Sequence, residues 1–105
     1  MKYMIEYEIR TAGLSYDQNL ANQEALIKAF GKWTPEDGLT VHAFLSNLTT
    51  GGYVLVEADD PKVVQAFVGK FVYWNEVTVV PVTEVADGVA SGTAAIAWAR
   101  DALTG

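Results

Sequence analysis

Apolar and polar residues alternate along four stretches of the chain, which is the spacing of β-strands with one buried face. The stretches are residues 2–10, 39–46, 53–58 and 77–82. In the first, Ile5 falls on the apolar side and Glu6 on the polar side. In the last, Pro81 cannot donate a ladder hydrogen bond, which predicts an edge strand.

Between these stretches the spacing changes to that of amphipathic helices. Ser15 with Gln18 has the form of a capping box, and Pro35 ends the first helix. Asp59 or Asp60 is expected to cap the second, with Pro61 at its first position. Their predicted inward stripes are Leu20, Gln23, Leu26, Ile27, Phe30 and Trp33 in the first helix, and Val63, Val64, Phe67, Val68 and Phe71 in the second.

The order βαββαβ predicts an α+β, ferredoxin-like domain over residues 1–83. Its four-stranded antiparallel sheet would carry both helices on one face, with strands 2–10 and 53–58 at the centre. Residues 84–105 are expected to form a C-terminal helical extension, capped by Ser91 and running through Ile96, Trp98 and Leu103.

Composition narrows the function. The chain has 105 residues, half of them apolar, which suits one domain. A net charge of −6 with only seven Lys and Arg disfavours nucleic acid and anionic membranes as partners. The absence of cysteine removes thiolate chemistry, and a single histidine removes a multi-histidine metal site within one subunit. No cofactor is expected. Glu6, Glu8 and Arg10 interrupt any signal-peptide stretch, so a bacterial-type cytoplasmic location is expected.

The candidate site is the polar side of the strands, which would face away from the helices. It is expected to gather Glu6, Glu8, His42, Tyr53 and Glu57. Burial of neighbouring carboxylates by a partner subunit would raise a carboxylate pKa. Glu6, His42, Glu57 and Tyr53 are therefore the candidate catalytic residues: proton carriers, with the Tyr53 hydroxyl as donor to an oxyanion.

Apolar and aromatic residues complete the expected ligand site. Phe44 and Leu55 are expected among the polar residues of that face, and Trp33 and Trp74 lie where they could roof a pocket or seal the rim of the core. With Glu8, these four form the candidate ligand-binding set. The simpler interpretation, in which the face is solvated or forms satisfied contacts at an interface, stays open.

Three motifs carry a resemblance to a known group of proteins. They are Glu57-Ala58-Asp59-Asp60-Pro61, Val80-Pro81-Val82 and Tyr3-Met4-Ile5-Glu6. They resemble a family of short uncharacterised bacterial proteins in the dimeric α/β-barrel superfamily. The resemblance implies a homodimer packed through its sheet faces, and relatives that include cofactor-independent monooxygenases, isomerases and cyclases. No catalytic motif of those enzymes is matched, and the chain departs from the pattern beyond Val85.

Two functions remain open at this point, together with a third, simpler one. The first is cofactor-independent acid/base chemistry on a small apolar, aromatic or polyketide-like ligand. The alternative is a non-enzymatic module that binds a metabolite or regulates a partner. The third is a domain that uses its polar face only for self-association.

Overall fold

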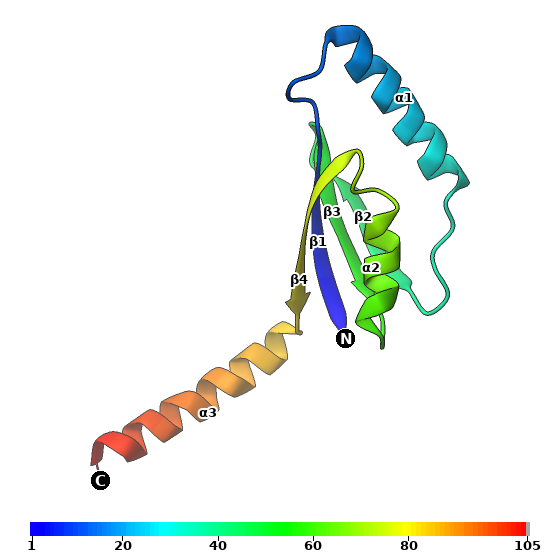
Figure 1. Cartoon of the computed structure of the whole chain (residues 1–105). Coiled ribbons are helices and arrows are strands. Elements are labelled where there is room, and N and C mark those ends of the chain that lie inside the picture. Colours follow the sequence, from blue (N-terminus) through cyan, green and yellow to red (C-terminus); the bar gives the residue numbers. More distant parts are fainter. Residues whose placement is uncertain (105) are drawn as a thin grey trace.

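The computed structural model describes residues 1–104, which form seven elements (Figure 1). In chain order they are β1 (Lys2–Ile9), α1 (Tyr16–Lys32), β2 (Thr40–Ser46), β3 (Gly51–Glu57), α2 (Pro61–Gly69), β4 (Asn75–Val82) and α3 (Val85–Thr104). The sheet is antiparallel, in the order β2-β3-β1-β4. This confirms the ferredoxin-like α+β arrangement, with β1 and β3 at the centre and Pro81 on the edge strand β4.

Strand parity places the core between the sheet and the helices. Ile5 of β1 and its ladder partner Val54 of β3 both point toward the helices. They are 2% and 1% exposed. Val56 is fully buried on the same face. From above, α2 adds Val64 and Phe67, each 4% exposed. The alternation read from the sequence is therefore confirmed for the two central strands.

A β-bulge in β2 breaks that alternation. Val41 pairs with Val56, but the next paired residue is Ala43, which lies opposite Leu55. The extra residue, His42, shifts all that follows by one position. Phe44 now pairs with Val54 on the helical side, so the prediction that Phe44 lies on the polar face is wrong. Leu45 takes its place on the reverse face, which is the side of the sheet turned away from the helices.

The first helix begins as predicted. The Ser15 hydroxyl accepts from the Gln18 amide at 3.1 Å, and the Gln18 side chain accepts from the Ser15 amide at 2.9 Å. Yet α1 buries none of its residues, and Figure 1 shows it standing off from the sheet. Leu20 and Ile27 remain 47% and 71% exposed. The predicted stripe faces the sheet only through its C-terminal part.

The second helix also begins as predicted, with Asp60 as its cap. The Asp60 carboxylate accepts from the Lys62 amide at 2.9 Å, and Pro61 occupies the first helical turn. A carboxylate here also complements the positive end of the helix dipole. Unlike α1, this helix rests directly on the core.

The third helix starts earlier than predicted and leads away from the rest of the chain (Figure 1). It begins at Val85, so Ser91 lies inside it and does not cap it. It buries no residue, and Trp98 is 73% exposed. The radius of gyration is 19.0 Å, against about 13 Å for a compact chain of this length. Gly105, the last residue of the expected extension, lies outside the described residues. Within residues 1–104, no helix has the length and apolarity needed to cross a membrane.

Candidate functional site

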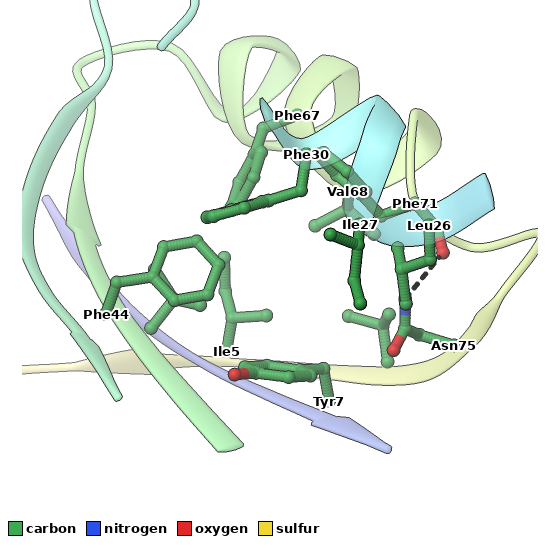
Figure 2. A pocket seen from close by; sticks show the side chains of 12 residues that line it. Ile5, Tyr7, Leu26, Ile27, Phe30, Phe44, Phe67, Val68, Phe71 and Asn75 are labelled. Carbon is green, nitrogen blue, oxygen red and sulfur yellow. Dashed lines mark hydrogen bonds between the residues drawn. The ribbon is translucent and has the colours of Figure 1, made fainter. Parts of the chain in front are cut away.

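An apolar pocket of about 210 Å³ lies between the helices and the sheet (Figure 2). The sheet forms its floor and α1 forms its roof, while α2 and the turn after it form the far wall. The lining residues are Ile5, Tyr7, Leu26, Ile27, Phe30, Phe44, Val54, Phe67, Val68, Phe71, Asn75 and Val77. This pocket is on the opposite side of the sheet from the predicted site.

Aromatic rings join the sheet to the helices around this pocket. Phe44 of β2 packs edge-on against Phe30 of α1, with ring centroids 5.2 Å apart, and against Tyr7 of β1 at 5.8 Å. Phe67 of α2 packs against Phe71 at 5.8 Å. Edge-to-face contacts at these spacings are favourable beyond simple area burial. They give the pocket walls of defined shape.

Two polar side chains interrupt the apolar lining. Tyr7 donates its hydroxyl hydrogen to the Leu45 carbonyl oxygen at 3.0 Å, and partial burial raises the pKa of the Tyr7 phenol. Asn75 is 4% exposed, and its Nδ2 donates to the Phe71 carbonyl oxygen at 3.0 Å. The Asn75 Oδ1 atom is buried and has no hydrogen-bond partner within residues 1–104. Both side chains are neutral at physiological pH.

Sequence reasoning missed Asn75 as a site residue. Asparagine just before a β-branched run is usually a turn residue. Here β4 begins at Asn75, which pairs with Ile9 of β1. Extending the alternation of Val77 and Val79 back by two positions would have placed Asn75 on the helical side. The period-two pattern therefore contained the information, but Asn75 lies two residues before the predicted start of the strand.

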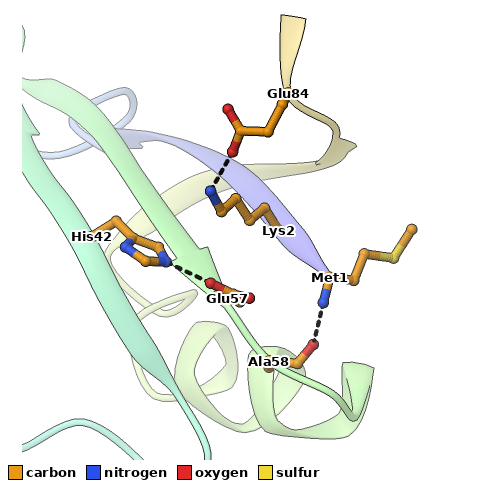
Figure 3. A network of polar contacts seen from close by, with 6 residues as sticks. All are labelled: Met1, Lys2, His42, Glu57, Ala58 and Glu84. Atoms are coloured by element: carbon orange, nitrogen blue, oxygen red, sulfur yellow. Dashed lines mark hydrogen bonds and ion pairs between the residues drawn. The ribbon is translucent and has the colours of Figure 1, made fainter. Parts of the chain in front are cut away.

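The reverse face of the sheet carries a hydrogen-bonded histidine and carboxylate (Figure 3). His42 Nε2 lies 2.7 Å from Glu57 Oε1. The hydrogen bond to His42, more than any other interaction, lowers the pKa of the Glu57 carboxyl below its ordinary value. This is opposite to the rise expected for a covered carboxylate cluster, because the pair is open to solvent, with the side chains 37% and 44% exposed. The bulge places His42 within reach of Glu57.

An ion pair adjoins this hydrogen-bonded pair (Figure 3). Lys2, which lies opposite Glu57 in the ladder, bonds to the Glu84 carboxylate just before α3. The hydrogen bond between them raises the pKa of Lys2 and lowers that of Glu84. Exposed pairs of this kind add little to stability. This pair does connect β1 to the residue just before α3.

The other two candidate catalytic residues lie elsewhere on the same face. Glu6 pairs with Tyr53 in the ladder between β1 and β3. Tyr53 and Glu57 are four residues apart on one strand, which corresponds to about 13 Å. The structure therefore brings together two pairs, Glu6 with Tyr53 and His42 with Glu57, and does not bring all four residues to one point.

The expected ligand-binding residues are also divided. Glu8 accepts a hydrogen bond from the Thr50 hydroxyl, and Leu55 lies half-buried on the reverse face. Phe44 lines the helix-side pocket. Trp33 and Trp74 meet in a second pocket of about 310 Å³ near the C-terminal end of α1, together with Lys32 and Lys70 among others. Neither pocket opens on the reverse face.

No group of three or more His, Asp or Glu side chains within the described residues could hold a metal ion. The arrangement is instead that of an α+β domain with an apolar pocket under its helices and hydrogen-bonded polar pairs on the other face of its sheet. The chain belongs to the family described as Domain of unknown function (DUF3303), whose model matches residues 1–96. A search of curated proteins found no match.

Proposed function

We propose that the protein binds a small, mostly apolar molecule in the pocket between α1, α2 and the sheet. The observation that carries this proposal is a pocket of about 210 Å³ walled by aromatic and aliphatic side chains from both helices and all four strands. Transfer of apolar surface from water into such walls gives about 25 cal/mol per Å². A small aromatic ring therefore gains enough from burial for measurable affinity.

The chemistry of the lining favours binding over catalysis. The two polar groups on the wall are a phenol and a carboxamide, from Tyr7 and Asn75. The carboxamide does not titrate, and burial raises the pKa of Tyr7 further from neutrality. Neither group can cycle a proton readily near neutral pH. We therefore assign the pocket to a metabolite-binding or regulatory module.

Acid/base chemistry of the isomerase, cyclase or monooxygenase type is a second candidate, located at His42 and Glu57. The 2.7 Å contact between them supports it, because a carboxylate can orient an imidazole for proton transfer. This chemistry requires a cover that excludes water from the reverse face. In the dimeric α/β-barrel relatives suggested by the sequence motifs, a second subunit provides that cover.

We further propose that this chain forms a homodimer through its reverse face. Leu45, Tyr53 and Val80 are 58%, 42% and 48% exposed there. Light scattering coupled to size exclusion should give twice the chain mass for the wild type. Leu45→Glu should give a monomer, while Leu48→Glu, in the hairpin loop at 96% exposure, should remain dimeric. A monomeric wild type at micromolar concentration would contradict the dimer.

Toluene titration followed by methyl NMR tests ligand binding. Signals of Ile5 and Val54, on the pocket floor, should shift and saturate. Val68→Phe fills the pocket from α2 and should abolish the shifts. Val80→Phe adds the same volume on the reverse face and should leave them unchanged. Absence of saturable shifts in the wild-type protein would refute the proposed pocket.

A further inference from the structure

Within residues 1–104, Asn75 is the one polar residue that is buried. Its Nδ2 donates to the Phe71 carbonyl oxygen at 3.0 Å, and the same carbonyl accepts the Asn75 backbone amide at 3.2 Å. These contacts fix the amide orientation, because a flipped amide would set two oxygens against each other. Oδ1 is therefore held on the pocket side, and Figure 2 shows it turned toward Tyr7.

A buried acceptor without a partner is unusual in a folded protein. Most buried polar groups are hydrogen-bonded, and exceptions call for an explanation such as a ligand or an internal water. No donor within residues 1–104 meets Oδ1. The pocket that Asn75 helps to line is otherwise apolar, apart from Tyr7. A donor on a bound molecule would satisfy the oxygen in place.

The second polar group, Tyr7, likewise presents an acceptor oxygen. The Tyr7 hydroxyl hydrogen is already donated to the Leu45 carbonyl oxygen at 3.0 Å. A ligand can therefore only donate to Tyr7, as it can only donate to Asn75 Oδ1. The two polar atoms thus select the same property in a ligand, which is a hydroxyl or N–H group.

The charge of the ligand follows from the same lining. No lysine, arginine, aspartate or glutamate is among the lining residues. An anion would meet acceptor oxygens and apolar walls with no compensating cation, and a cation would lose its hydration without a counter-charge. A neutral molecule is the one that these walls accept.

We propose that the ligand is a neutral hydroxylated compound of the phenol or small alcohol class, whose hydroxyl donates to Asn75 Oδ1 while its apolar body fills the pocket. This inference rests on the proposed ligand-binding function and adds that the pocket prefers a ligand with a hydroxyl group. The side of the pocket formed by α1 is loosely packed. Ile27 on the pocket roof is 71% exposed, and α1 buries none of its residues.

Phenol and toluene are near-isosteric probes that differ in one donor. Their dissociation constants would be measured by NMR titration with wild type and with Asn75→Leu. The quantity of interest is the ratio of the two constants, because the hydration of each free ligand cancels between proteins. Loss of one satisfied buried acceptor should shift this ratio against phenol by roughly tenfold.

A matched control is Asn22→Leu, the same change at an exposed position of α1 outside the pocket lining. It should leave the ratio at the wild-type value. A second readout needs no variant, and it decides the matter if Asn75→Leu does not fold. In the wild type, saturating phenol should shift the side-chain amide signals of Asn75 more strongly than saturating toluene does.

The possible results separate the two proposals. If both probes bind and the ratio is unchanged by Asn75→Leu, the hydroxyl specificity is wrong and the apolar pocket stands; an internal water then satisfies Oδ1. If neither probe shifts a pocket signal, ligand binding itself is wrong. Equal shifts of the Asn75 amide by phenol and toluene would likewise overturn the specificity.

Discussion

The two helices that cover the sheet are held to it very differently. Both are capped by their predicted residue, Ser15 for α1 and Asp60 for α2. Nevertheless α2 buries Val64 and Phe67, whereas α1 has 17 residues and buries none. A cap specifies where a helix begins, but the inward side chains decide how firmly it packs.

The inward positions explain the difference. In α2 they are valines and phenylalanines, and the stripe is continuous. In α1 the half-buried positions include Asn19 and Gln23, whose amides lose hydration without a strong apolar gain. The aromatic residues Phe30 and Trp33 carry most of its contact with the sheet side, through Phe44 and Phe67. The pocket lies beneath the weakly held helix.

The largest predicted contrast is between one phenylalanine on each helix. Phe67→Ala should cost about 3–5 kcal/mol of unfolding free energy, because the residue is only 4% exposed. Phe30→Ala should cost about 1 kcal/mol, because the ring is already 45% exposed and has less area to lose. Urea denaturation measures both. Equal losses would show that α1 packs as firmly as α2 in solution.

Removing the N-cap of each helix compares α1 with α2 through a smaller change in free energy. Asp60→Ala should lower the global free energy of unfolding by about 1 kcal/mol, because α2 unfolds together with the core. Ser15→Ala removes a similar cap energy, but should act locally. Hydrogen exchange in α1 should become about fivefold faster, with little change in the denaturation midpoint. A full shift of the midpoint by Ser15→Ala would contradict the independence of α1.

The smallest expected effect comes from the reverse face and should not distinguish the helices. The lowered pKa of Glu57 means that its contribution to stability is present above the ordinary value of 4.5 and is lost as pH falls through the folded pKa. His42→Ala should return the Glu57 pKa toward 4.5, followed by NMR of the carboxyl carbon. Ser46→Ala, at the far end of β2, should leave the titration unchanged. An unaltered Glu57 titration in His42→Ala would rule out the hydrogen bond in solution.

Local patterns in the sequence predicted most of the fold. The alternation of Ile5 and Val54, the capping box at Ser15 and the Asp60-Pro61 start are confirmed, as is the edge position of Pro81. Each depends on a few neighbouring residues. Such local patterns are reliable because the same short-range steric effects and hydrogen bonds act in the folded structure.

The site was harder to predict, because it depends on register between distant strands. One extra residue at His42 turns Phe44 to the helical side, and nothing within β2 alone marks it. Alternation shows that Tyr53 and Glu57 lie on the same face of the sheet, but it does not show how far apart they are. That distance depends on the rise per residue along the strand. The space beneath α1 depends on how weakly Asn19 and Gln23 hold that helix, and the alternation pattern carries no such information.

The bulge at His42 has a consequence for chain-length variation. The strand contains one more residue than its neighbour needs between Val41 and Ala43. A shortened chain that lacks His42 would keep both flanks aligned with β3, and Phe44 would remain over Val54. The loss would be confined to the imidazole beside Glu57. Related chains that are one residue shorter here should retain the pocket while lacking the histidine–carboxylate pair on the other face of the sheet.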